Sequence, residues 1–112
     1  MPRAATTSDA FNAVAEPRRR EILEYLGPEE RAVGEIADAL GLAQPSATKH
    51  LQVLLNVGLV DVRRDGRRTL YRTNAAAIRP LHEWTGTFAQ YWRGQLHRIK
   101  EHAEAKAPKS KP

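Results

Sequence analysis

The feature that most constrains this chain is a change of hydrophobic period near residue 58, where a helical pattern gives way to a short hairpin. Residues 59–64 and 67–73 have the pattern of two strands, and they flank Asp65-Gly66. Asp-Gly between two extended segments is a strong signal for a two-residue hairpin turn. The sequence therefore predicts a mainly α protein with one small β-hairpin.

Four helices are predicted before the hairpin, from the spacing of apolar side chains and from residues that start or stop helices. They cover about residues 9–15, 17–26, 33–40 and 44–57. Ser8 is expected to cap the first helix and Pro17 to open the second. Glycines at positions 27, 41 and 58 are expected to end the other segments.

A single long helix is predicted from about Asn74 to residue 105, and Pro80 is expected to mark its true start or a kink. The predicted order is four helices, two strands and a last helix, which is the order of a winged helix-turn-helix domain. Residues 8–105 are expected to form this domain, with a C-terminal dimerisation helix. Residues 1–7 are expected to be a flexible N-terminus and residues 106–112 a disordered basic tail.

The helices at 33–40 and 44–57 are joined by the short turn Leu40-Gly41-Leu42. Glycine lets the chain reverse, and the small side chain of Ala37 lets two helices cross closely. This spacing is typical of a helix-turn-helix, although many helical pairs that do not bind DNA share it.

The helix at 44–57 has two different faces at about 100° per residue. Ala47, Leu51, Leu54 and Leu55 cluster on the side expected to face the core. The opposite side is polar and nearly free of acidic residues, which is typical of a recognition helix in a DNA major groove. The residues nominated for DNA contact are Gln44, Ser46, Thr48, Lys49, His50 and Gln52. The alternative is an ordinary solvated helix face.

The predicted hairpin is rich in arginine. With Asp65-Gly66 as the turn, Arg64 would face Arg67 and Arg63 would face Arg68. Like charges directly opposite each other destabilise a hairpin, so these four arginines suggest that DNA phosphates neutralise them. The alternative is a basic edge strand that discourages aggregation.

Composition narrows the classes of function. The 112 residues carry a net charge of +5, and such a charge favours polyanions. The absence of cysteine excludes disulfides, thiolate metal sites and thiol catalysis. No apolar run approaches the roughly 20 residues that span a bilayer, and the N-terminus lacks a secretory pattern, so a cytoplasmic protein is expected. No enzyme motif is present, and no cofactor is expected.

Several segments resemble ArsR-type winged-helix repressors over about residues 9–100. They are Glu16-Pro17-Arg18-Arg19 with Ile22-Leu23, Val33-Gly34-Glu35-Ile36-Ala37, Gln44-Pro45-Ser46-Ala47-Thr48-Lys49-His50-Leu51, Leu54, Gly58-Leu59-Val60 and Arg64-Asp65-Gly66-Arg67-Arg68-Thr69-Leu70-Tyr71. The resemblance implies a homodimer on an inverted-repeat operator, DNA contacts at Gln44, Ser46, Thr48 and Lys49, and an inducer that weakens binding. The sequence departs from the family at Ala43, where a Ser or Thr cap is usual.

The last predicted helix carries a long stripe of large apolar side chains. We expect this stripe to form a dimer interface together with Phe11, the alternative being an intramolecular core. Its members are Leu81, Trp84, Phe88, Tyr91, Trp92, Leu96 and Ile99.

Many members of the resembled family sense metals. Here the weak candidate ligands are His82, His97 and Glu101, with His102 beside them. His82 and His97 lie roughly opposite the apolar stripe, so solvated histidines are the favoured interpretation and no metal site is predicted.

The sequence thus predicts a sequence-specific regulator that binds double-stranded DNA, as a homodimeric repressor with an unidentified inducer or partner protein. The alternative is a winged-helix module that binds protein or RNA. Such a module would show apolar anchors on the helix at 44–57, where Val53 is the exception among polar side chains.

Overall fold

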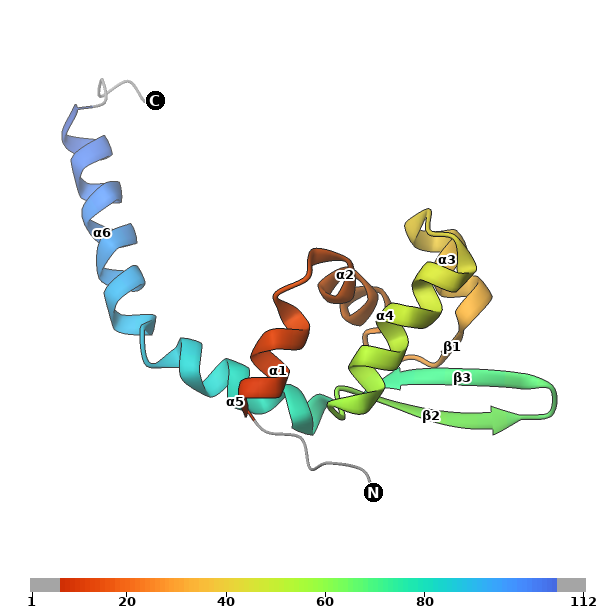
Figure 1. Ribbon diagram of the computed structural model, residues 1–112. Coiled ribbons are helices and arrows are strands. Elements are labelled where there is room, and N and C mark those ends of the chain that lie inside the picture. Colours follow the sequence, from red (N-terminus) through yellow and green to blue (C-terminus); the bar gives the residue numbers. More distant parts are fainter. Residues whose placement is uncertain (1–6, 107–112) are drawn as a thin grey trace. The chain divides into compact units, whose positions relative to one another are not determined.

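The computed structural model describes residues 7–106 (Figure 1). The chain divides after Leu81 into two units, which are treated separately. The elements are α1 (Thr7–Val14), α2 (Pro17–Leu26), β1 (Arg31–Ala32), α3 (Val33–Leu40), α4 (Gln44–Asn56), β2 (Val60–Asp65), β3 (Arg68–Thr73), α5 (Ala75–Gly86) and α6 (Ala89–Lys106). The predicted loose ends, 1–7 and 106–112, lie outside the described residues apart from Thr7 and Lys106, which are helical.

The first unit is built around one apolar core to which helices and sheet both contribute. Its nine buried members come from α1 to α4, the start of β2 and the residue before it: Ala10, Ala13, Ile22, Leu26, Ile36, Leu51, Leu54, Leu59 and Val60. Fully burying a Val, Leu or Ile side chain stabilises a fold by about 1.5–3 kcal/mol. The apolar spacing that predicted α2, α3 and α4 is therefore the spacing that fills the core, while α1 contributes two alanines, Ala10 and Ala13.

The turn between α3 and α4 is a compact helix stop. Gly41 has φ +66°, a left-handed conformation that glycine adopts without steric cost. The Leu42 N–H donates to the Ala37 carbonyl at 2.9 Å and the Gly41 N–H to that of Asp38 at 3.4 Å, which is the Schellman pattern. Ala37 is buried. The predicted helix-turn-helix spacing is confirmed.

α1 begins at Thr7, two residues before the predicted start, so the expected role of Ser8 as its N-cap is wrong. The other end of α1 is closed by arginines of α2. Arg19 Nε donates to the Ala13 carbonyl at 2.6 Å, and Arg20 Nη1 donates to the Val14 carbonyl at 2.7 Å. Cations are favourable at a helix C-terminus, where carbonyl groups lack partners.

The sheet has the strand order β1-β3-β2, and both pairings are antiparallel. β1 was not predicted, because two residues carry no periodic signal and the strand exists only through its pairing with β3. Arg31 and Ala32 of β1 lie opposite Tyr71 and Leu70. Figure 1 shows the β2–β3 hairpin extending beyond the helices of this unit.

The predicted hairpin turn is wrong by one residue. Gly66 and Arg67 form the turn, so Asp65 lies opposite Arg68, while Arg64 and Arg63 lie opposite Thr69 and Leu70. Gly66 has φ +64°, and positive φ at the first central residue is typical of a type II′ turn. An Asp65-Gly66 turn of type I′ would force positive φ on Asp65, and no non-glycine residue in the described chain has it.

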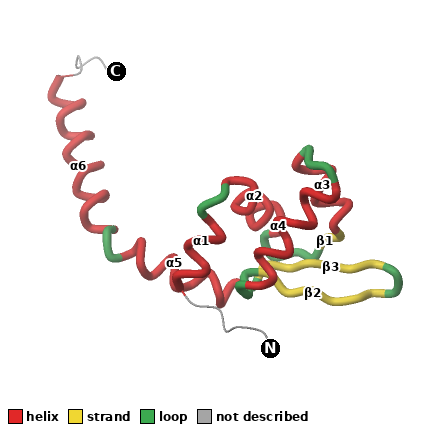
Figure 2. Tube along the Cα trace, in the orientation of Figure 1, coloured by secondary structure: helices red, strands yellow, loops and turns green. Residues whose placement is uncertain are grey.

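The long C-terminal helix is in fact two helices, α5 and α6, separated by a turn (Figure 2). The break is at Thr87 and Phe88 rather than at Pro80, which lies inside α5. Thr85 and Thr87 donate their hydroxyls to the carbonyls of His82 and Trp84, at 3.0 and 2.7 Å. Such bonds compete with the helical ladder, and Gly86 between them is a weak helix former. Along the described chain, no helix is long and apolar enough to cross a membrane.

Candidate nucleic-acid interface

The faces predicted for α4 are confirmed. Ala47, Leu51 and Leu54 are fully buried, whereas Lys49 and Thr48 are exposed on the other side. Of the remaining nominated residues, Gln44 and Gln52 are exposed, and Ser46 and His50 are half-buried. From Gln44 to Asn56 the helix contains no acidic residue, so its outer face offers hydrogen-bonding groups and one lysine without a repelling charge.

The N-terminus of α4 begins without a side-chain cap. Ala43 has the extended backbone of an N-cap, with φ −66° and ψ 143°, but no side-chain hydrogen bond. The helix start is instead fixed by Pro45 in its first turn and by the Ala47 N–H, which donates to the Ala43 carbonyl at 3.0 Å. Further along, Gln52 donates to Asn56 Oδ1 at 3.0 Å, which holds the Gln52 amide along the helix.

We call the hairpin of β2 and β3, residues 60–73, the wing. It carries five arginines and two aspartates. Because of the observed register, the predicted repulsion between facing arginines does not occur. Arg68 lies opposite a carboxylate, and Arg63 and Arg64 lie opposite uncharged residues. Repulsion between facing arginines is therefore not an argument that the wing binds an anion.

Two wing arginines are instead paired with glutamates, one just before β1 and the other in the first turn of α3. Arg63 meets Glu30 through two parallel bonds, Nε to Oε2 at 2.7 Å and Nη2 to Oε1 at 2.8 Å. Arg68 Nη2 lies 2.8 Å from Glu35 Oε1, which also accepts the Ala32 N–H at 2.8 Å. Hydrogen bonding from Arg63 holds the pKa of Glu30 below its ordinary value, and the Ala32 N–H with the Arg68 charge does the same for the pKa of Glu35.

Sequence reasoning missed both glutamates. Glu35 is the third residue of α3, and in that position a glutamate is explained well enough by helix capping. Glu30 is half-buried and follows the exposed Glu29. Each is 33 residues from its arginine along the chain. The sequence did show an excess of arginine in the hairpin and acidic residues elsewhere. That pattern does not say which arginine pairs with which glutamate.

The other two predicted wing residues have different surroundings. Within the described part of the chain, Arg64 has one side-chain hydrogen bond, from Nη1 to the Thr69 hydroxyl at 3.4 Å. Arg67 lies exposed in the turn, and among the described residues it makes no ion pair. These two guanidinium groups keep their full charge available to an external anion.

Beside the Arg63–Glu30 pair is a charged recess on the wing. It is lined by Glu30, Asp61, Val62, Arg63 and Arg72. Two carboxylates and two guanidinium groups balance each other there, so the recess does not have the excess charge that an anion site needs.

The second unit exposes the predicted apolar stripe. Trp84, Phe88, Tyr91, Trp92, Leu96 and Ile99 have exposed fractions between 43 and 72%. The Trp84 and Phe88 rings pack edge to face at 5.2 Å between centroids, although the helix is interrupted between them. Leu81 belongs to the first unit and packs against its core, and Phe11 is half-buried.

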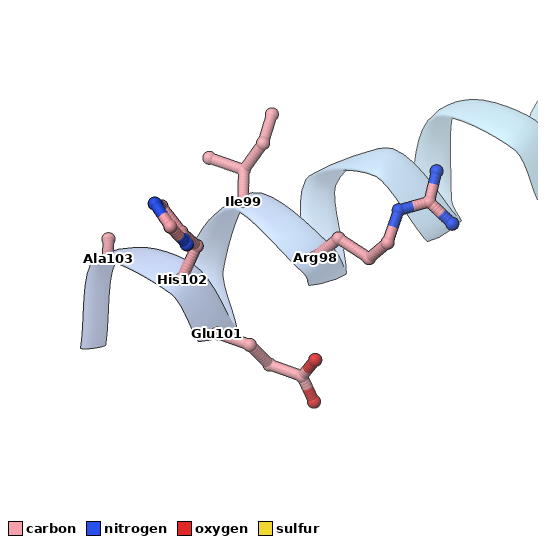
Figure 3. A pocket seen from close by; sticks show the side chains of 5 residues that line it. All are labelled: Arg98, Ile99, Glu101, His102 and Ala103. Carbon is pink, nitrogen blue, oxygen red and sulfur yellow. The ribbon is translucent and has the colours of Figure 1, made fainter. Parts of the chain in front are cut away.

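The histidines of the second unit are the weak candidate metal ligands. Among the described residues, no three His, Asp or Glu side chains gather where they could hold an ion. His82, Glu101 and His102 are exposed, and the His97 side chain lies outside what the structure describes. A concavity on α6 is lined by Arg98, Ile99, Glu101, His102 and Ala103 (Figure 3). All five belong to one helix, so this concavity lacks the walls of a small-molecule pocket.

Known proteins match this arrangement. A family model described as "Helix-turn-helix domain" matches residues 14–63. The "Probable mercury resistance operon repressor" of Streptomyces lividans is 36% identical over 76 residues, which are 68% of this chain and 61% of the repressor. The HTH-type transcriptional regulator Rv2034 of Mycobacterium tuberculosis is 40% identical over 73 residues, which cover 62% of this chain and 68% of that regulator.

A solved structure gives the same assignment. It is a homodimeric winged helix-turn-helix DNA-binding domain from Mycobacterium bovis, described as "a possible ArsR-family transcriptional regulator". It is 37% identical, the TM-score is 0.63, and the match covers 74% of this chain and 77% of that one. The chain spans 26 to 61% of the lengths of the first three curated relatives that it matches. The chain belongs to the ArsR family of winged helix-turn-helix regulators.

Proposed function

We propose that this protein is a homodimeric transcriptional repressor that binds an inverted-repeat operator in double-stranded DNA. The observation that carries the proposal is the exposed face of α4, which is polar apart from Val53 and contains no acidic residue. Membership of the ArsR family and relatives named as repressors support it.

In this proposal each α4 enters a major groove with its N-terminal turns. Gln44 and Lys49 bond base edges, since amide and ammonium groups match the donors and acceptors of the groove. Ser46, Thr48, His50 and Gln52 bond bases or nearby phosphates. The wing lies against the DNA backbone that flanks the groove, and wing arginines bind phosphates there.

The proposed dimer forms through the exposed stripe of the second unit. Six large apolar side chains in contact with water on one short segment are typical of an interaction surface. The related domain from Mycobacterium bovis is homodimeric, which supports the same assembly here. Phe11 and Leu81 are proposed as peripheral members, because Leu81 already packs against the core of its own unit.

The test is to select fragments of the host genome with purified protein at physiological salt and to sequence what is retained. We expect one inverted repeat with half-sites about one helical turn apart. A reporter gene placed behind that repeat should be expressed less when the protein is present. DNA retained without a shared motif would contradict the operator, and failure to retain any DNA would favour the alternative interaction module.

A further inference from the structure

The two faces of the wing differ in their partners. Side chains directly opposite each other in an antiparallel pair lie on the same face, and neighbours along a strand alternate. Arg63 therefore shares a face with Arg68, and Arg64 shares the opposite face with Thr69. Glu30 and Glu35 bracket β1 and reach only the first of these faces.

Pairing with a carboxylate changes what an arginine can do for DNA. Affinity for phosphates comes largely from counterions that a neutralised phosphate releases. An arginine whose charge is cancelled by a glutamate offers little of that release. The Arg63–Glu30 pair is a fork-to-fork contact, which also fixes the direction of the guanidinium plane.

From this geometry we infer that Glu30 and Glu35 are positioning residues that hold the wing against the start of α3 through Arg63 and Arg68. Contact with phosphates is then left to Arg64 and Arg67. The inference rests on the proposed DNA-binding function. It divides four arginines that look equivalent in sequence into two that orient the wing and two that bind.

The test compares the wild type with the E30Q/E35Q variant, in which two amides replace two carboxylates of the same shape. Affinity for a duplex of arbitrary sequence is measured against salt concentration. Release of Arg63 and Arg68 should steepen the slope of log K against log salt by about 1 for each arginine. The ratio of operator to arbitrary-sequence affinity should fall. A slope equal to that of the wild type would overturn the inference.

E29Q is the matched control, because Glu29 lies on the same turn but pairs with Arg31, which is outside the wing. It removes one carboxylate charge, as each of the two substitutions in E30Q/E35Q does, and we expect the wild-type slope. A steeper slope for E29Q would mean that net charge, not release of wing arginines, is responsible. A variant that is merely less stable would lose affinity at every salt concentration without a steeper slope.

The E30Q/R63Q variant separates the two roles of Arg63. If the pair orients the wing and does not neutralise phosphate, removing both partners should leave the salt slope at the wild-type value. A slope shallower by about 1 would mean that Arg63 binds phosphate while paired, and would overturn the inference. Failure of the wild type to bind any duplex would instead contradict the proposed function itself.

Discussion

At the scale of single residues, Ala43 precedes α4 without capping it. Its backbone has N-cap geometry, but its methyl group cannot accept a hydrogen bond from the first turn of α4. Ser and Thr at such positions satisfy one of the unpaired N–H groups. The helix that we propose for base contact therefore starts with less support than its geometry allows.

The variant A43S should stabilise the protein by about 0.5–2 kcal/mol, because its hydroxyl can accept from the first turn of α4. Denaturant unfolding followed by circular dichroism measures this change. A39S, at an exposed alanine inside α3, is the control and should be neutral or slightly destabilising. Equal effects of the two substitutions would argue against capping as the cause.

Lys49 and Gln44 should set base preference. Replacing either with alanine should reduce discrimination between the operator and a singly mismatched site by about 1–3 kcal/mol. Competition binding with operator variants measures it. Wing variant R67A should lower affinity for all duplexes alike, so loss of discrimination in R67A without loss of overall affinity would contradict this division of labour.

At the scale of elements, the wing connects stability to pH through Glu30 and Glu35. Both carboxyls have a pKa lowered below the ordinary value of a glutamate in the folded protein. A lowered folded pKa contributes stability above the unfolded pKa, and this contribution is lost as pH falls through the folded value. The wild type should therefore be more stable than E30Q/E35Q at neutral pH, and the difference should vanish in acid.

Urea unfolding of both proteins between about pH 7 and pH 3 tests this expectation. The other carboxyls titrate in both proteins and largely cancel in the comparison. The difference in free energy of unfolding should stay constant down to about pH 5 and then shrink. A difference that persists at the acid end would mean that the amides perturb the fold by some route other than the lost charge.

The sequence predicted the elements that are defined locally. Helices α2, α3 and α4 were found because Pro17, Gly41 and their apolar spacing act within a few residues. The hairpin was found as well, but its register was not, because Gly66 can serve as the first or the second central residue of a turn. The helix break after Gly86 was hidden because the aromatic spacing continues across it.

What depends on distant contacts could not be predicted. β1 exists through pairing with β3, some 40 residues further along the chain. The glutamates that pair with Arg63 and Arg68 are separated from them by 33 residues. The outer face of α4 was predictable, since it follows from the angle between residues in one helix. The division of the wing arginines into two paired and two unpaired residues, within the described chain, was not predictable, because it depends on these distant glutamates.

At the scale of the whole molecule, the exposed aromatic stripe should determine the assembly. W92E introduces a charge into the stripe, whereas Q90E adds the same charge beside it on α6. W92E should be monomeric in sedimentation equilibrium, and Q90E should remain dimeric. Because two linked half-site contacts act together, operator affinity of W92E should fall by on the order of 10²–10⁴-fold. A dimeric W92E would contradict the proposed interface.

The location of Glu30 and Glu35 has a consequence for how such a regulator can change its target. Both precede α4 and neither belongs to it, while their partners follow it. The exposed positions of the segment 44–56 can therefore be exchanged without removing either ion pair, provided that the buried Ala47, Leu51 and Leu54 are kept. A chimera that takes these positions from another family member keeps both partners of the Arg63–Glu30 pair and of the Arg68–Glu35 pair. If α4 reads the operator as proposed, base preference can then change through α4 while the two ion pairs that orient the wing stay the same.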